Sequence, residues 1–267
     1  MKLTIDIRDN SAKYYDLNPH RPDDISFYKS LLTSPDVSVL ELGCGTGRVL
    51  LPLSESCTYI HGLDLSEAMI ELSNKRLLET KIPSNKALAE VGDITNFDLG
   101  RTFDLIIAPY RVLQNLETDE QVDGLFSCIH RHLAIGGSCI LNVFKPFRDA
   151  DGLRAEWVNN TENLAWERVI DGQRITCHDK RARMDATNLI LYPELIYRTY
   201  SEDELKDETV LKVVMRCYYP DQFKRLIVDH GFEIMNTWGG YAEEIYGEGP
   251  ELVVQFSNMT DQTQTYR

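Results

Sequence analysis

The chain has 267 residues, of which 43% are hydrophobic and 26% charged, as in an ordinary globular protein with one large domain or an elaborated one. Its formal net charge of −14 disfavours nucleic acid as a substrate, because an acidic surface repels phosphate backbones. No apolar run approaches the roughly 18 residues of a membrane span, and the opening residues lack the apolar core of a signal peptide. We therefore expect a cytoplasmic protein whose partner is a small molecule.

The cysteines are scattered, with no C-x-x-C spacing and no His-x-Cys cluster. Several lie in apolar stretches, which is typical of buried free thiols in a reducing compartment. The pattern predicts neither disulfides nor a metal site. The six positions are Cys44, Cys57, Cys128, Cys139, Cys177 and Cys217.

Residues 11–32 precede the first predicted strand. Ile25, Tyr28 and Leu31 recur at helical spacing, and Asp23 or Asp24 is a suitable N-cap for that helix.

A glycine-rich turn follows the first predicted strand, in the stretch V-S-V-L-E-L-G-C-G-T-G-R-V-L from Val37 to Leu50. The apolar run predicts a strand buried on both faces. Gly43, Gly45 and Gly47 then allow a turn with positive φ and bare backbone, which can approach a ligand or simply be tight. We expect a helix over about 47–55. The G-x-G-x-G spacing differs from the G-x-G-x-x-G of dinucleotide-binding folds.

Two acids follow the next two predicted strands. The second strand ends at Asp64, 21 residues after Gly43, close to the ~20 expected for a carboxylate that bonds ribose hydroxyls. Ser66 begins a helix that runs to about Thr80. The third strand, 87–91, is followed by Gly92 and Asp93, an acceptor when ionised. A helix cap and a turn aspartate are the alternative roles of the two acids.

Polar side chains cluster after the fourth predicted strand, at 103–108. Tyr110, Arg111, Gln114 and Asn115 lie where the carboxyl ends of parallel strands meet ligands. We expect Tyr110 and Gln114 to face a pocket, and Arg111 either to do so or to pair with an acid. A helix over 120–133, a tight turn at Gly136-Gly137 and a fifth strand over 138–144 complete the alternation.

Residues 150–219 depart from this rhythm and predict four antiparallel strands, at 164–170, 174–184, 189–200 and 210–219. Their aromatic residues either line a cavity or form the segment's own core, and we favour the core for most of them: Trp157, Trp166, Tyr192 and Tyr197. Pro220 then opens a helix ended by Gly231, before two final strands at 232–238 and 251–256.

These motifs, E-L-G-C-G-T-G, D-L-S-x-x-M, G-D-x-x-x-F and L-A-I-G-G, resemble those of class I S-adenosylmethionine-dependent methyltransferases. The resemblance extends over about residues 12–145 by motif and 220–257 by pattern; Ile135 stands where the family usually has proline. The β-rich insertion resembles that of small-molecule N- and O-methyltransferases, including those that dimethylate amino sugars. The implied fold is α/β: a Rossmann-like seven-stranded sheet, mostly parallel with an antiparallel last strand, plus an antiparallel β insertion.

The resemblance implies a cofactor, S-adenosylmethionine, with S-adenosylhomocysteine as product and no metal. It assigns Tyr15 to the sulfonium, Arg21 to the cofactor carboxylate and Met69 to the adenosine, with surface packing as the alternative for Tyr15 and Arg21. Tyr110 and Gln114 would position substrate. The other implied cofactor-binding residues are Glu41, Gly43, Cys44, Gly45, Gly47, Asp64, Leu65, Gly92, Asp93, Ile94, Ala108 and Pro109.

The expected organisation is a cofactor-covering segment (1–36), a cofactor-binding core (37–149), an antiparallel lid (150–219), the remainder of the core (220–257) and a disordered tail (258–267). The expected function is methyl transfer to a small-molecule amine or hydroxyl, chiefly by positioning. Two alternatives stay open: a binding protein without catalysis, and an NAD-dependent oxidoreductase, which the glycine spacing disfavours. The identity of the acceptor and the oligomeric state do not follow from the sequence.

Overall fold

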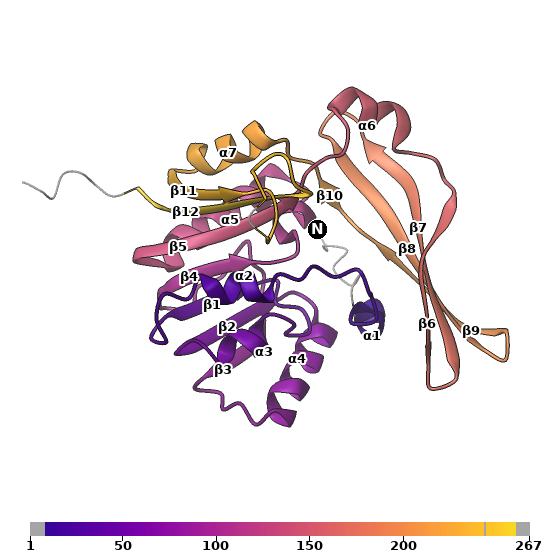
Figure 1. Cartoon of the computed structure of the whole chain (residues 1–267), viewed down its shortest axis with the longest axis horizontal. Helices are drawn as coiled ribbons and strands as arrows, with labels where there is room; N and C mark the ends of the chain where they lie inside the picture. Colours follow the sequence, from indigo (N-terminus) through magenta and orange to yellow (C-terminus); the bar gives the residue numbers. More distant parts are fainter. Residues whose placement is uncertain (1–8, 243, 260–267) are drawn as a thin grey trace, which may run out of the picture.

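The computed structural model describes residues 9–242 and 244–259. Its central sheet has the strand order β11-β12-β5-β4-β1-β2-β3, in which β12 runs antiparallel to both of its neighbours and the other pairs are parallel (Figure 1). The predicted fold class is confirmed. The strands are β1 (Ser38–Leu42), β2 (Tyr59–Asp64), β3 (Ala87–Val91), β4 (Phe103–Ala108), β5 (Leu133–Phe144), β11 (Phe232–Trp238) and β12 (Glu251–Asn258).

Alternation along the strands builds two apolar layers, one on each face of this sheet. On β1, Val39 packs in one layer and Leu40 and Leu42 in the other. Helices α2 (Ile25–Ser30), α3 (Leu50–Ser54) and α4 (Glu67–Glu79) cover the first layer, and α5 (Asp119–His132) and α7 (Pro220–Asp229) cover the second. Both faces are therefore buried, as a parallel sheet requires.

The strand order reverses between β1 and β4, which pair directly through residues such as Val39 and Leu105. From this point the chain proceeds outward on one side through β2 and β3, and on the other side through β5. In open α/β sheets, the crevice beyond the carboxyl ends of such strands is where ligands bind. The turns after Leu42 and Ala108 therefore meet at the position that the topology favours for a site.

A second sheet follows a short helix, α6 (Ala150–Glu156), and projects beyond the core (Figure 1). Three of the four predicted strands are confirmed, but the fourth is wrong. The chain turns at Glu202 and Asp203, which have φ of 52° and 64°, so the strand that pairs with β8 next begins at Glu204, and a short strand follows at Met215. The strands are β6 (Glu162–Ile170), β7 (Gln173–Asp185), β8 (Ile190–Ser201), β9 (Glu204–Lys212) and β10 (Met215–Arg216).

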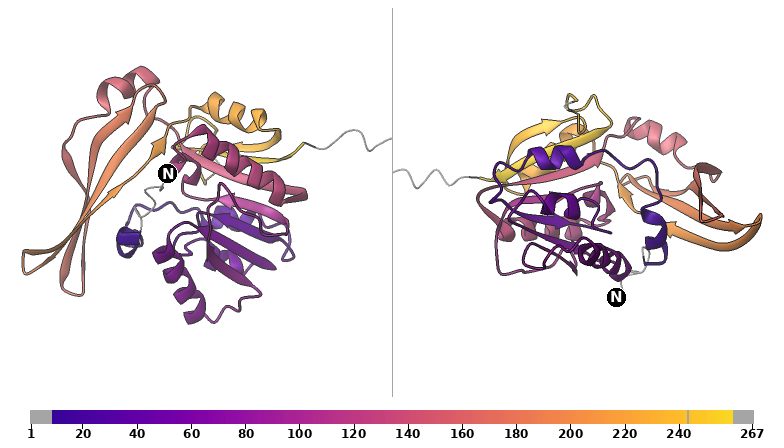
Figure 2. Two further views of the ribbon diagram at one scale, coloured as in Figure 1. Left: turned by 180° about the vertical axis from the view of Figure 1, so that it is seen from behind. Right: turned by 60° about the horizontal axis from the view of Figure 1, so that its bottom comes forward.

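The leader, the segment 9–24 ahead of α2, begins with η1 (Asp9–Ser11) and α1 (Ala12–Tyr15), and α1 lies between the core and the second sheet (Figures 1 and 2). Tyr14 stacks on Tyr197 with ring centroids 4.7 Å apart, and its hydroxyl donates to Asp207 at 2.6 Å. Trp166 packs in the same cluster, whereas Trp157 packs near α6. Trp157, Trp166 and Tyr197 therefore belong to the core of the insertion, as we expected for most of its aromatic residues. Tyr192 instead donates to Glu117 in an exposed position.

Smaller boundaries also differ from expectation. Helix α3 begins at Leu50, because residues 45–49 form turns, and β5 begins at Leu133 and runs through the two glycines with a register shift.

All six cysteines are buried and free. Within residues 9–242 and 244–259, no helix is long and apolar enough to cross a membrane. The predicted disorder of 258–267 concerns mostly residues outside the described ranges, and the division into segments stays a prediction.

Tyr14 should be a principal link between the insertion and the leader. Replacing Tyr14 with Ala removes a 3% exposed ring and its bond to Asp207, so we expect a loss of about 3 kcal/mol in unfolding free energy. Urea unfolding measures it. Lys13→Ala is the matched control, since it removes only an exposed ion pair to the same carboxylate and should cost less than about 1 kcal/mol. Equal losses in the two variants would contradict this view.

Candidate active site

The glycine turn after β1 has positive φ at all three glycines, between 53° and 79°. Only one of them leaves backbone open toward a ligand. A Cβ at Gly43 would lie 2.6 Å from Val112 Cγ2, and one at Gly47 would collide with Leu51, so these two glycines admit protein neighbours. At Gly45 the nearest atom is a ring carbon of Tyr15, at 3.8 Å. The expected close approach of a ligand therefore concerns Gly45.

Asp64 lies at the carboxyl end of β2 and is bound to the same turn. Its carboxylate accepts the Gly45 N–H at 2.9 Å and the Ser66 N–H at 3.0 Å. Ser66 in turn caps α4 by accepting the Met69 N–H, which confirms the predicted helix start. Asp64 thus fixes the position of the turn, and its proposed contact with ribose stays a prediction.

Leu65, Met69 and Cys44 are the predicted apolar residues of the cofactor site near Asp64. Leu65, the next residue, is 45% exposed, which is unusual for a leucine beside a buried strand and suits contact with an adenine ring. Met69, in the first turn of α4, is 2% exposed. Cys44 points to β2, where an added Cβ on Gly62 would meet its Sγ at 2.7 Å. Burial raises the pKa of the Cys44 thiol, so it serves as a small apolar side chain.

Glu41, at the end of β1, is a buried acid beneath the turn. One of its oxygens, Oε2, has no hydrogen-bond partner in the described part of the chain, and the side chain is almost fully enclosed. Burial raises the pKa of this carboxyl well above its usual range; Asp24 and Asp64 raise it further, and Arg48 opposes them. An orphaned acceptor of this kind is suited to a cationic ligand group.

Two ion pairs hold the leader against the glycine turn. Arg48 donates to Asp24 through both terminal nitrogens, at 2.5 and 2.9 Å, and Asp24 is fully buried. Burial alone would lower the pKa of Arg48, but its bonds to Asp24 outweigh this and raise it. Asp24 is the N-cap residue of α2, as one of the two predicted candidates, but its side chain makes no capping bond and binds Arg48 instead.

Asp16 forms the second link. It accepts hydrogen bonds from Arg76 on α4, from the Thr46 hydroxyl at 3.1 Å, and from Arg21 at 2.6 Å. Arg21, expected to meet the cofactor carboxylate, is thus bound to a protein acid, and the expectation stays untested. Asp16, Thr46 and Arg76 were not predicted, because nothing in their spacing indicates that they meet.

Tyr110 follows β4 and lies beside the glycine turn. Its ring stands edge-on to Tyr15 at 6.4 Å between centroids, and the Arg48 guanidinium lies 5.8 Å from its centroid. Asn18 of the leader approaches its hydroxyl at 3.5 Å. The structure therefore brings together Tyr15, Gly45 and Tyr110, three of the predicted residues, from three separate segments.

Gln114 and Arg111 are engaged by the protein. The Gln114 amide donates to the Arg216 carbonyl and accepts the Phe144 N–H, both at 2.8 Å, and the residue is 1% exposed. It joins β5 to β10 rather than facing open space, and its predicted substrate contact remains untested. Arg111 pairs with Glu251, which is the alternative foreseen for it.

The remaining predicted residues lie along the same edge. Asp93 Oδ1 accepts the Thr95 N–H and hydroxyl, as a turn aspartate does, and Ile94 beside it is half-buried. Gly92 donates to the Asp64 carbonyl at 2.9 Å. Ala108 and Pro109 are buried at the end of β4. Their contacts with cofactor stay predictions.

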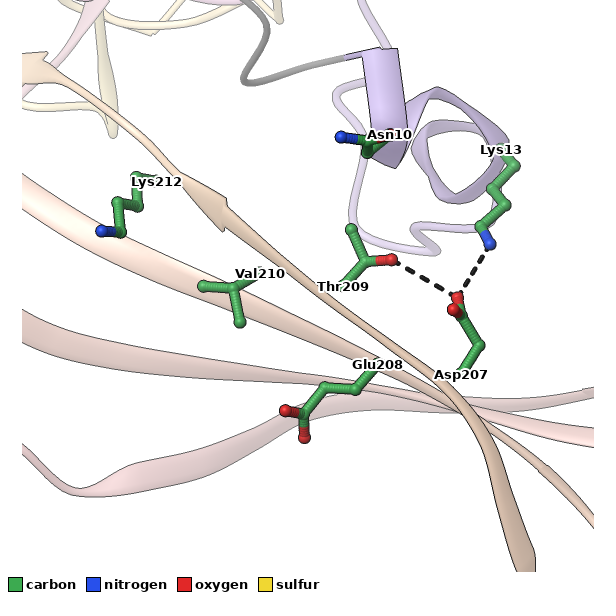
Figure 3. Close-up of a pocket in the computed structure, with 7 residues that line it drawn as sticks. All are labelled: Asn10, Lys13, Asp207, Glu208, Thr209, Val210 and Lys212. Atoms are coloured by element: carbon green, nitrogen blue, oxygen red, sulfur yellow. Dashed lines mark hydrogen bonds and ion pairs between the residues drawn. The ribbon is translucent and has the colours of Figure 1, made fainter. Parts of the chain in front are cut away.

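An open cavity of about 490 Å³ lies elsewhere, between η1 and β9 (Figure 3). Its walls are polar, and the Asp207 carboxylate there already accepts hydrogen bonds from Lys13 and Thr209. None of the predicted site residues lines it. Among the described residues, no group of three or more His, Cys, Asp or Glu side chains is arranged to hold a metal ion.

The strand order, the glycine turn at the β1–β4 reversal and the acid at the end of β2 are the arrangement expected of a class I methyltransferase fold. Residues 39–137 match the Methyltransf_25 family, described as a methyltransferase domain.

Two curated relatives match parts of this chain. The dTDP-4-amino-2,3,4,6-tetradeoxy-D-glucose N,N-dimethyltransferase of Saccharopolyspora spinosa is 33% identical over 104 residues, 39% of each chain. The dTDP-3-amino-3,4,6-trideoxy-alpha-D-glucopyranose N,N-dimethyltransferase of Streptomyces venezuelae is 30% identical over 123 residues, 46% of this chain and 47% of that protein. The similarity thus spans less than half of either relative.

A solved structure extends the similarity of fold to nearly the whole chain. It is an S-adenosylmethionine-dependent methyltransferase from Clostridium acetobutylicum, with a TM-score of 0.72 and 14% identity, covering 94% of this chain and 98% of that one. The predicted arrangement of a seven-stranded sheet with an added antiparallel sheet therefore occurs in a known methyltransferase.

Glu41 should destabilise the ligand-free protein at neutral pH. Its pKa is raised in the folded state, so ionising it disfavours folding as pH rises from its unfolded value, near 4.5, through the folded value. We expect Glu41→Gln to increase the unfolding free energy at pH 8 by on the order of 1 kcal/mol, with the gain vanishing near pH 4. Urea unfolding against pH tests this. The exposed Glu71→Gln on α4 should show no such trend; a Glu41→Gln variant less stable than wild type at pH 8 would contradict the prediction.

Proposed function

We propose that this protein transfers a methyl group from S-adenosylmethionine to an amine of a small molecule, with an amino sugar as the preferred acceptor class. The observation that carries the proposal is the charge of the cradle, by which we mean the buried carboxyl groups of Glu41, Asp24 and Asp64 around the glycine turn. Glu41 offers an orphaned buried oxygen beside Asp24 and Asp64, and a cofactor with an ammonium and a sulfonium brings the cations that such a cradle lacks.

The same cradle opposes a dinucleotide. A pyrophosphate needs backbone N–H groups of the glycine turn, as in dinucleotide-binding folds. Here the Gly45 N–H already donates to Asp64, and the acids nearby would repel a phosphate. The alternative of an NAD-dependent oxidoreductase therefore has no support from the geometry.

Each part of the site has a role in this proposal. Glu41 would receive the cofactor ammonium, Asp64 the ribose hydroxyls, and Leu65 and Ile94 the adenine ring, with Asp93 on its amino group. The rings of Tyr15 and Tyr110 would flank the transferring methyl, where their negative faces favour a cation and exclude water. When bound, S-adenosylmethionine supplies an electrophilic methyl group. The protein's contribution is then chiefly to hold the acceptor in line, which is worth about 7–11 kcal/mol.

An amine acceptor is preferred for two reasons. It can lose its proton to water before attack, so no general base is needed. The His–carboxylate pairs of the described residues are His61–Glu90, His132–Asp98 and His230–Asp123, and none includes a residue of the Tyr110 turn. The two curated relatives are N,N-dimethyltransferases of amino sugars by name, which supports the same class.

Calorimetry with S-adenosylmethionine, S-adenosylhomocysteine and NAD tests the cofactor first. We expect micromolar binding of both adenosyl ligands and none of NAD. Asp64→Ala should weaken S-adenosylhomocysteine binding by about ten- to a hundredfold, the worth of a hydrogen bond to a charged group, while Asp36→Ala on an exposed turn should not change it. Unchanged affinity in Asp64→Ala would refute the ribose assignment, and binding of NAD alone would refute the cofactor.

The acceptor is tested with a matched pair, a dTDP-linked 4-amino-4,6-dideoxyhexose and its 4-hydroxy counterpart, by mass spectrometry of the products. We expect a gain of one or two methyl groups on the amine only. Methylation of the hydroxyl alone would refute the amine preference. Binding of cofactor with no turnover on a panel of amines would favour a binding protein without catalysis.

A further inference from the structure

Three side chains from three strand ends form a closed ring of hydrogen bonds behind Tyr110. The Arg111 backbone N–H donates to Asn142 Oδ1 at 3.2 Å, and Asn142 Nδ2 donates to Glu251 Oε2 at 3.0 Å. The Arg111 guanidinium completes the ring by donating to the Glu251 carboxylate, at 3.0 Å from Nε. Asn142 is 1% and Glu251 6% exposed, so these two members of the ring are buried.

The backbone inside this ring is strained. Tyr110 and Arg111 both adopt left-handed φ, of 59° and 68°, although neither is glycine. An L side chain disfavours this conformation by roughly tenfold per residue in population, so two in succession require outside support. Such strain persists where surrounding contacts over-determine it. The bond to the Arg111 N–H and the bonds to its guanidinium together supply that support from β5 and β12.

The strained turn sets two contacts of the cofactor site. Val112, which follows directly, places its Cγ2 where the Cβ of a larger residue at Gly43 would be. Tyr110, the first residue of the turn, stands edge-on to Tyr15 and beneath Arg48. A return of Arg111 to right-handed φ would redirect the chain on either side of it. The ring of bonds thus controls where the aromatic side chain lies relative to the glycine turn.

We propose that Glu251 and Asn142 are positioning residues, which act through Arg111 to hold the Tyr110 ring at the acceptor side of the cofactor site. The inference rests on the proposed function for its catalytic consequence, but its structural part stands independently. Burial lowers the pKa of Arg111 while the bonds and charge of Glu251 raise it, with a net rise, so the guanidinium stays charged and bound throughout the working pH range.

The first test reads the position of Tyr110 without turnover. Protein labelled with 3-fluorotyrosine gives fluorine resonances from its 13 tyrosines, and the one lost in Tyr110→Phe reports this ring. We expect a single dispersed resonance that shifts on adding S-adenosylhomocysteine. In Glu251→Gln it should broaden or move toward the value of unfolded tyrosine. An unchanged resonance in Glu251→Gln would overturn the proposal.

A pair of double variants separates backbone support from charge pairing. Arg111→Gly with Glu251→Gln removes both charges and supplies a residue that accepts left-handed φ freely. Arg111→Gln with Glu251→Gln removes the same charges but keeps the conformational cost. We expect the glycine pair to restore the Tyr110 resonance and the glutamine pair not to. If the two double variants gave the same Tyr110 resonance, Arg111 and Glu251 would act only as an ion pair and not as support for the backbone, which would overturn the proposal.

Turnover and binding give the functional counterpart. With a methyl acceptor in hand, Glu251→Gln should lower kcat at least about tenfold, since the strained turn is worth about that factor per residue, and the glycine pair should recover most of it. The affinity for S-adenosylhomocysteine should stay within about threefold, because Glu41, Gly45 and Asp64 are untouched. A fall in affinity with kcat preserved would contradict the positioning role. Absence of turnover in wild type itself would refute the proposed function while leaving the resonance test valid.

Discussion

The buried pair of Asp24 and Arg48 is the interaction on which the arrangement of the site depends. Asp24 has no exposed surface, and a carboxylate in that position is tolerated only with a bound cation. The Arg48 guanidinium supplies it, and the same group lies over Tyr110. One cation therefore joins the leader, the glycine turn and the end of β4. Removing either partner would leave a buried charge and release three segments at once.

This pair acts together with the link through Asp16. Asp24 binds the turn after Gly47, and Asp16 binds Thr46 within it, so the leader is attached at two adjacent points of the cofactor loop. The leader also contacts the insertion, because the Tyr14 hydroxyl donates to Asp207. Consecutive residues Tyr14, Tyr15 and Asp16 thus contact the insertion, the glycine turn and α4. A short segment of this kind couples the insertion to the glycine turn and α4.

The core of the fold was predictable because it follows local rules. Buried runs such as 103–108 read as central strands, the Ser66 cap and Pro220 gave helix starts, and the spacing from Gly43 to Asp64 fixed one βαβ unit. The turn at Asp171-Gly172 marked a hairpin through its glycine. The turn at Glu202-Asp203 contains no glycine to mark it, and the start of β9 was therefore misplaced.

The site was predictable where a residue's own backbone carries the signal. The three glycines predicted a turn. The structure was needed to show that Val112 occupies the space at Gly43 and that Tyr15 faces Gly45. Hydrogen bonds between residues far apart in the sequence cannot be predicted from motif spacing. Glu251 lies 140 residues from Arg111, and Asn142 reads as an ordinary strand residue. Gln114 looked like a pocket residue because it follows β4, yet its amide joins β5 to β10.

The buried acids around Glu41 favour a cationic ligand over an anionic one on electrostatic grounds alone. Burial, Asp24 and Asp64 all oppose ionisation of Glu41, and Arg48 only partly compensates. The ligand-free protein therefore holds an acid whose ionised form the fold disfavours. A cationic ligand relieves this tension and stabilises the folded state by its own binding energy, whereas an anionic one would add to it. If Glu41 receives the cofactor ammonium as proposed, the acid that disfavours the ligand-free fold is also the one that selects a cationic ligand over an anionic one.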